Sequence, residues 1–154
     1  MKASTWNSTA APARILLVDD NKMGLMARKS VLEEFGYSIT TAAEGAEAFD
    51  CFRHGSFDLI VTDYKMPKMD GLEFIRQVRE LAAQTPIILL SGYVEALGLV
   101  ESNTGADVVI SKNANEVPHL IRSVHRLLRR NAPKKPAASQ RAAPLAAAAG
   151  RKRV

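Results

Sequence analysis

Charged and hydroxyl side chains follow several short apolar runs of this sequence, each directly after the run ends. Asp19 and Asp20 follow the first run, Asp63 follows another, and later runs are followed by Ser91 and by Lys112. Three carboxylates brought together repel one another and raise their pKa values, a conflict that Mg²⁺, a hard cation, resolves. A lysine adds a point charge that can pair with a phosphoryl group, and a serine adds a hydroxyl donor. These residue types predict phosphoryl-transfer chemistry, in which positioning and charge neutralisation supply most of the catalysis.

These side chains meet only if the chain alternates between strands and helices. Apolar and β-branched runs predict five strands, at residues 14–18, 37–42, 58–62, 87–90 and 107–111. Helical patterns lie between and after them, at residues 21–35, 44–54, 72–81, 94–100 and 116–130. The fourth of these helices is weak and is interrupted by Gly98. The alternation predicts an α/β fold, a doubly wound five-stranded parallel sheet with helices on both faces. Such a sheet binds ligands at the carboxyl ends of its strands.

Helical spacing also predicts which faces of the helices are apolar. In the first helix the four-residue spacing picks out one face, made of Met23, Ala27, Val31 and Phe35. In the third helix Leu72, Ile75 and Val78 are expected to face inward, with Leu81 as a further candidate. The last helix has a stripe of Val117, Leu120, Ile121, Val124, Leu127 and Leu128, and a basic face of Arg122, Arg126, Arg129 and Arg130.

Composition indicates a single soluble domain. The 154 residues are 47% apolar and 24% charged, which is typical of globular proteins. No apolar run approaches the roughly 20 residues of a membrane span, and the first residues lack the apolar core of a secretory signal. The lone cysteine, Cys51, excludes an internal disulfide and is interpreted as a packing residue. These features favour a cytoplasmic location.

The net charge of +5 belongs to one end of the chain. Residues 133–154 contain six Lys and Arg and no acid, whereas the other 15 Lys and Arg face all 16 Asp and Glu, which leaves −1 for residues 1–132. Ala, Pro and isolated bases lack the apolar periodicity that offsets ordering entropy. We therefore expect a disordered leader at 1–13, one domain at 14–131, and a disordered basic Ala/Pro-rich tail at 132–154.

Five segments together resemble the receiver domain of two-component response regulators, of the single-domain, chemotaxis-regulator-like kind. They are ILLVDDN (15–21), AAEGAEAF (42–49), FDLIVTDYKMPKMDGLEFIRQVR (57–79), PIILLSGY (86–93) and ADVVISK (106–112). They run in the family's order and cover nearly all of residues 14–130. The resemblance implies the flavodoxin-like strand order 2-1-3-4-5.

The resemblance also implies a role for each polar residue. Asp63 matches the phosphoacceptor, whose carboxylate attacks phosphorus to give an aspartyl phosphate. Asp19 and Asp20 match the acidic pair that holds Mg²⁺ with Asp63, and the backbone carbonyl of Lys65 is the implied further ligand. In the family, a lysine and a hydroxyl stabilise the phosphoryl group, and the matching residues here are Lys112 and Ser91. The small Gly92 beside Ser91 leaves access to the site.

The chain departs from the family pattern at two positions. Val109 stands where the family often has an aromatic switch residue, and Tyr93 is a candidate to compensate. Asn113 follows Lys112 where the family usually has a proline in a cis bond, and non-proline residues rarely form one. The loop that carries Lys112 is therefore expected to be held differently.

The predicted function is that of a stand-alone receiver, a phosphorylation-dependent switch or relay protein rather than an enzyme. The implied donor is a sensor histidine kinase or a phosphotransfer protein. An unknown downstream protein would dock on the last-helix face, and a homodimer is possible. One alternative is a minimal transcription regulator whose basic tail binds DNA. Another is an aspartate-nucleophile phosphatase, which wants an acid at the position of Lys65. The plain structural alternative for Asp19 and Asp20 is an N-cap of the first helix.

Overall fold

Five short aliphatic runs form the strands of one sheet. They are β1 (Arg14–Val18), β2 (Ser38–Ala42), β3 (Leu59–Asp63), β4 (Ile87–Ser91) and β5 (Val108–Ser111). The computed structural model describes residues 11–131, and in it all neighbouring strands pair in parallel in the order β2-β1-β3-β4-β5. The structure therefore confirms the predicted doubly wound sheet and its strand order.

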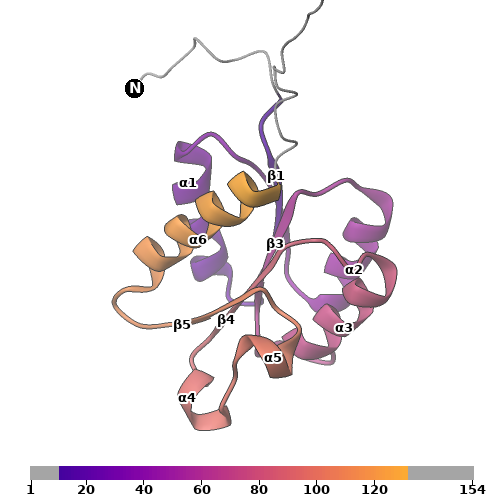
Figure 1. Cartoon of the computed structure of the whole chain (residues 1–154), viewed down its shortest axis with the longest axis vertical. Helices are drawn as coiled ribbons and strands as arrows, with labels where there is room; N and C mark the ends of the chain where they lie inside the picture. Colours follow the sequence, from indigo (N-terminus) through magenta and orange to yellow (C-terminus); the bar gives the residue numbers. More distant parts are fainter. Residues whose placement is uncertain (1–10, 132–154) are drawn as a thin grey trace, which may run out of the picture.

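Helices cover both faces of this sheet (Figure 1). They are α1 (Lys22–Glu34), α2 (Gly45–His54), α3 (Gly71–Leu81), α4 (Val94–Leu97), α5 (Glu101–Thr104) and α6 (Glu116–Asn131). Side chains of α1 and α6 share one core cluster with β1, β3, β4 and β5. Side chains of α2 and α3 form a second cluster on the opposite face. Every residue of β3 and β4 is buried, so the central strands are fixed from both sides.

Strand β3 ends one residue later than predicted. It spans Leu59–Asp63 rather than residues 58–62, and Asp63 pairs in register with Leu90. Strand β4 likewise includes Ser91, which pairs with Ser111. The polar residues therefore belong to the ladder itself, which positions their side chains more firmly than a loop would.

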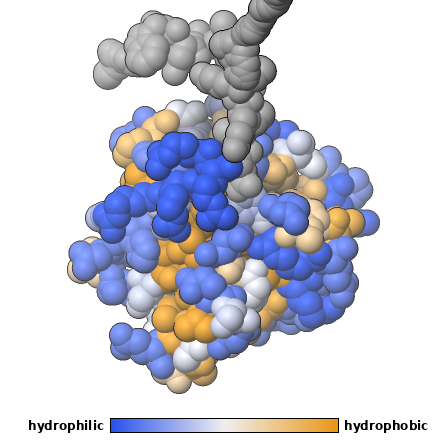
Figure 2. Space-filling model, viewed as in Figure 1, coloured by the Kyte–Doolittle hydropathy of each residue, from blue (hydrophilic) through white to orange (hydrophobic). Residues whose placement is uncertain are grey.

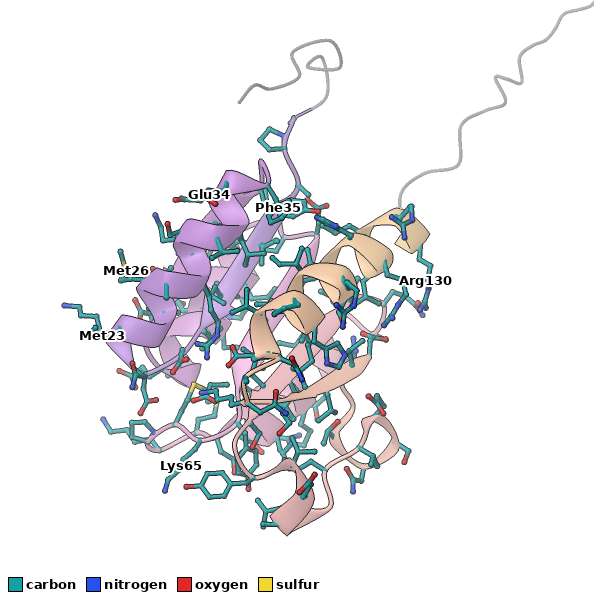
Figure 3. All side chains as sticks on the ribbon, turned by 90° about the vertical axis from the view of Figure 1, so that its left-hand side faces the viewer. Met23, Met26, Glu34, Phe35, Lys65 and Arg130 are labelled. Atoms are coloured by element: carbon teal, nitrogen blue, oxygen red, sulfur yellow. The ribbon has the colours of Figure 1, made fainter. Side chains whose placement is uncertain are left out.

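Helix α1 does not bury the face that its apolar spacing predicted. Met23 and Phe35 are 82% and 52% exposed, and Figure 3 shows Met23 and Met26 pointing away from the body of the protein. The buried residues are Leu25, Arg28 and Leu32. The prediction failed because a basic residue lies on the inward face, so that face looks polar. In α3 the inward residues include Phe74, while Leu81 is 55% exposed.

The weak fourth helix is shorter than predicted, and a further short helix that was not predicted follows it. Gly98 has a φ of 63° and ends α4, and α5 begins at Glu101. The described residues therefore contain six helices instead of the five predicted. The Glu101 side chain accepts a hydrogen bond from the N–H of Val109, 2.9 Å away, on the edge strand β5.

The terminal predictions lie largely outside the described residues. These include positions 1–10 of the expected leader and the whole expected tail at 132–154. Across residues 11–131, no helix has the length and apolar character needed to cross a membrane.

Candidate functional site

The end of β1 places two carboxyl groups at the carboxyl edge of the sheet. Asp19 is 2% exposed and Asp20 is exposed. Neither caps α1, because the N-cap is Asn21, whose side chain accepts a hydrogen bond from the N–H of Gly24 at 2.9 Å. The Asp19 Oδ1 atom accepts the Asn21 N–H at 2.8 Å. The capping alternative is thus wrong, because neither carboxyl group caps α1.

Strand β3 delivers Asp63 to the same edge. The loop after Asp63 closes tightly, since the N–H of Gly71 donates to the carbonyl of Tyr64 at 2.7 Å. A Cβ on Gly71 would lie 2.4 Å from the Asp63 carbonyl oxygen. The glycine is therefore needed for space, while the positive φ of this loop (71°) falls on Lys68. The close return of the chain holds the end of β3 against α3.

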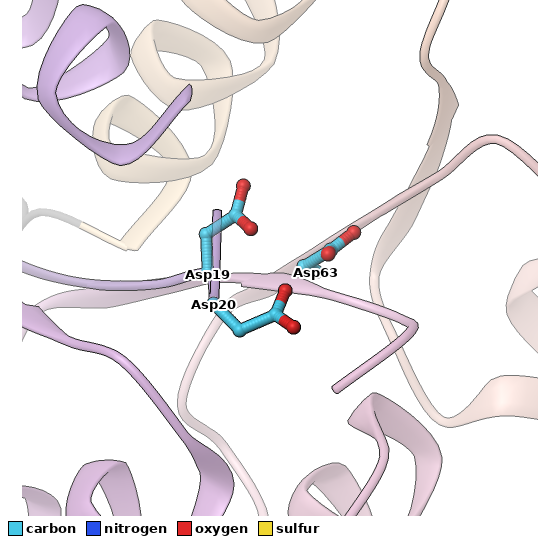
Figure 4. A group of neighbouring side chains, drawn as sticks. All are labelled: Asp19, Asp20 and Asp63. Carbon is cyan, nitrogen blue, oxygen red and sulfur yellow. The ribbon is translucent and has the colours of Figure 1, made fainter. Parts of the chain in front are cut away.

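The three carboxyl groups converge at this edge (Figure 4). One oxygen from each of Asp19, Asp20 and Asp63 lies within 4.8 Å of the others. Asp20 and Asp63 line an open cleft of about 490 Å³, whose lining also includes Lys65, Ser91, Gly92, Tyr93 and Lys112. The structure thus brings together every side chain predicted for the site. A cluster of hard oxygen donors of this kind fits a divalent cation such as Mg²⁺.

Lys112 neutralises part of this charge. Its Nζ lies 2.7 Å from Asp63 Oδ1 and 3.7 Å from Asp19 Oδ2. The Lys112 N–H donates to the carbonyl of Ser91 at 2.9 Å, which ties the loop after β5 to β4. The lysine is therefore held between two strand ends, with its ammonium group directed at Asp63.

The environment of Asp63 raises the pKa of its carboxyl group. Burial is the main cause, and the negative charge of Asp19 adds to it. The hydrogen bond and positive charge of Lys112 act in the opposite direction but do not cancel the effect. Ionised Asp63 is thus held at a cost in free energy, as a reactive group is.

We expect Asp63→Asn to raise the melting temperature by a few degrees at pH 7 in metal-free buffer. A pKa raised above the ordinary 3.8 means that ionised Asp63 lowers the free energy of unfolding above the folded-state pKa. This penalty disappears as the pH falls below both values, so the gain should shrink on acidification. Thermal melts across pH would measure it. A lower melting temperature for the variant at pH 7 would contradict the expectation.

Ser91 and Gly92 line the same cleft. Ser91 is 1% exposed, and its Oγ accepts the N–H of Tyr93 at 2.8 Å. A Cβ on Gly92 would meet nothing within 4 Å, so this position is open. Tyr93 is 42% exposed, with Lys65 Nζ 5.5 Å from its ring centroid. Ser91 is thus a buried residue of the cleft lining, and the open space lies beside it at Gly92.

A cluster of three charged residues next to the site was not predicted. Arg28 on α1 donates to Asp19 Oδ2 at 2.6 Å and to Glu116 Oε2 on α6 at 2.5 Å. The sequence held one signal, because Arg28 falls at helical spacing between Leu25 and Leu32, the residues that α1 buries. An arginine on a buried face requires acidic partners.

Both departures from the family pattern are visible in the structure. Val109 is half-buried and packs against the core cluster of α2 and α3. The described chain has no cis peptide, in keeping with Asn113 after Lys112. Asn113 accepts the N–H of Asn115 through Oδ1 at 2.9 Å, and its carbonyl accepts the N–H of Glu116. Asparagine thus builds a turn that leads directly into α6.

The sequence is similar to known receiver domains. The sequence model of the response regulator receiver domain matches residues 15–125. Response regulator MprA of Mycobacterium sp. (strain KMS) is 34% identical over 123 residues, which cover 79% of this chain and 53% of that protein. The chain spans about half, or less, of the length of the first curated relatives it matches.

Solved structures show the same likeness. The response regulator protein TrrA from Thermotoga maritima, in complex with Mg²⁺ and BeF, is 36% identical, with a TM-score of 0.69 over 75% of this chain and 98% of that one. The receiver domain of the Francisella response regulator 1452 is 30% identical, with a TM-score of 0.72 over 78% of this chain and 99% of that one.

Proposed function

Because the chain belongs to the response regulator receiver domain family, we propose that Asp63 is the residue on which it accepts a phosphoryl group. Receiver domains are switches of two-component signalling rather than classical enzymes, and they interact with histidine kinases or phosphotransfer proteins. The observation that carries the proposal is the position of Asp63. It is a 6% exposed carboxylate of raised pKa, 2.7 Å from Lys112 and within 4.8 Å of two further acids.

The proposed reaction uses the side chains around the cleft. A carboxylate oxygen of Asp63 attacks the donor's phosphorus, the bond from phosphorus to the donor's imidazole nitrogen breaks, and the imidazole keeps that electron pair. The Lys112 ammonium group then pairs with the new phosphoryl oxygens instead of the carboxylate. The Ser91 hydroxyl donates a hydrogen bond to one of these oxygens. Gly92 leaves room for the donor to approach.

We propose that Asp19, Asp20, Asp63 and the backbone carbonyl of Lys65 hold Mg²⁺ at this site. The clustered carboxylate oxygens are the donors that this ion prefers. When bound, the ion would neutralise charge on the phosphoryl oxygens. Lys112 positions the nucleophile, and the buried strand β3 fixes it in place.

The test is to incubate the wild-type protein with a small acyl phosphate and Mg²⁺ and to measure the intact mass. One added phosphoryl group per chain is expected, because the cleft can admit a small donor without a kinase. The addition should fall to background when a chelator removes Mg²⁺, since three clustered carboxylates then repel the anionic donor. An unchanged wild-type mass in the presence of Mg²⁺ would refute the proposal.

We further propose that residues 14–131 act as a cytoplasmic receiver whose output passes through α6. The exposed side chains of Arg122, Arg126, Arg129 and Arg130 have no ion-pair partner among residues 11–131, and strongly hydrophilic residues gather over α6 in Figure 2. Unpaired guanidinium groups on one helix face favour an acidic downstream partner. Population of the partner-binding state would rise when phosphorylation of Asp63 stabilises it.

A further inference from the structure

Helix α1 buries a guanidinium group beside the acidic site. Arg28 is only 9% exposed and lies between the core residues Leu25 and Leu32. Burying a charge is costly unless its partners are well placed. The burial of Arg28 therefore indicates that its charge interacts with acidic partners nearby.

Arg28 bridges two acids from distant parts of the chain. Its Nη1 lies 2.6 Å from Asp19 Oδ2, and its Nε lies 2.5 Å from Glu116 Oε2. Burial favours a lower pKa for Arg28, but the hydrogen bond to Glu116 and the charges of both acids outweigh it and raise the pKa. The guanidinium is thus charged, and it joins the end of β1 to the start of α6.

The backbone leaves space for this bridge. Gly24 lies one helical turn before Arg28, and a Cβ there would come within 3.0 Å of Arg28 Nη1 and 3.4 Å of Asp19 Oδ2. A larger residue here would require the guanidinium to shift by a few tenths of an ångström. The absence of a side chain at Gly24 therefore leaves the space that the Arg28 guanidinium occupies.

Asp19 has donors around both of its carboxylate oxygens, and Arg28 is one of them. Asp19 Oδ1 accepts the N–H of Asn21 at 2.8 Å. Its Oδ2 faces both Arg28 at 2.6 Å and Lys112 at 3.7 Å. A divalent cation entering the cleft must therefore compete with resident positive charge for Asp19.

We propose that Arg28 is a positioning residue and a resident counter-ion of the acidic site. It orients Asp19 and lowers the Mg²⁺ affinity of the cleft, and Glu116 limits this effect by sharing the guanidinium. The inference rests on the proposed metal site and concerns how strongly that site binds. A purely structural link between α1 and α6 would change stability without changing metal affinity.

The test is titration calorimetry with Mg²⁺ alone, in the absence of any phosphoryl donor. The Arg28→Met variant keeps a side chain of similar length without its charge. It should bind Mg²⁺ about tenfold more tightly than the wild type, because a nearby positive charge is removed. Glu116→Gln should bind a few-fold more weakly, because Arg28 then pairs with Asp19 alone. The matched control is Lys29→Met, which removes a neighbouring charge that pairs with Glu33 on the surface. Its affinity should equal that of the wild type.

A double variant protects the test against misfolding. Arg28→Met alone leaves Glu116 without its partner, whereas Arg28→Met/Glu116→Gln removes both charges and keeps the net charge. It should also bind Mg²⁺ more tightly than the Glu116→Gln variant. Equal affinities in all variants, or weaker binding after loss of Arg28, would overturn this inference alone. No binding by the wild type or by any variant would overturn the metal site itself and this inference with it.

Discussion

Asp63→Asn should take up no phosphoryl group from an acyl phosphate and Mg²⁺, under conditions in which the wild-type chain is modified. The amide nitrogen and oxygen of asparagine occupy the space of the carboxylate, but a neutral amide is a very poor nucleophile toward phosphorus. Because Asp63 ends a fully buried strand, the substitution changes the chemistry and leaves the position unaltered. The loss should be complete, to background in intact-mass measurements.

Asp58 offers a matched control for this experiment. It precedes the other end of β3, where its Oδ2 accepts the N–H of Arg14 at 2.7 Å, far from the cleft. Asp58→Asn should be modified as fully as the wild type. If Asp63→Asn still gains one phosphoryl group, the acceptor is a different side chain and the assigned role of Asp63 is wrong.

Gly71→Ala should lower the free energy of unfolding by about 3 kcal/mol, as overpacking a tight site does. Its Cβ would lie 2.4 Å from the Asp63 carbonyl oxygen and 2.9 Å from the Tyr64 Cα, both backbone atoms that cannot rotate away. The chain after β3 must move to relieve the clash. The rate of modification by an acyl phosphate should fall as well, since Asp63 shifts with its backbone.

Gly92→Ala is the control for Gly71→Ala, because it adds the same methyl group beside the same cleft with nothing within 4 Å. Urea unfolding should show a change of less than about 0.5 kcal/mol for Gly92→Ala. Equal stabilities for the two variants would mean that the loop of residues 64–70 relaxes freely, and that it does not position Asp63.

The sequence was sufficient to predict the sheet and the cluster at its edge. Continuous aliphatic runs such as those of β3 and β4 are typical of strands that are buried on both faces of a parallel sheet. Because the strands are parallel, their polar ends lie at the same edge. The resemblance to a known family supplied the strand order, because periodicity does not distinguish one order of parallel strands from another.

The face of α1 and the bridge made by Arg28 were beyond this reasoning. Spacing favoured Met23 and Phe35, since four apolar residues on one side outweigh a pair of leucines separated by an arginine. What decides the true face is the presence of Asp19 and Glu116 nearby, and Glu116 lies 88 residues away in the sequence. Long-range charge pairing leaves no periodic signal. The short helix α5 was missed for a related reason, since four residues are too few to show a period.

The hydrogen bond from the N–H of Val109 to the carboxylate of Glu101 protects part of an outer strand of the sheet. An outer strand normally presents unpaired backbone groups that can recruit a strand from another molecule. On β5 one of these donors is already occupied by a side chain from the preceding helix, so an incoming strand would find its ladder interrupted. The bond thus works against edge-to-edge pairing with other copies along β5.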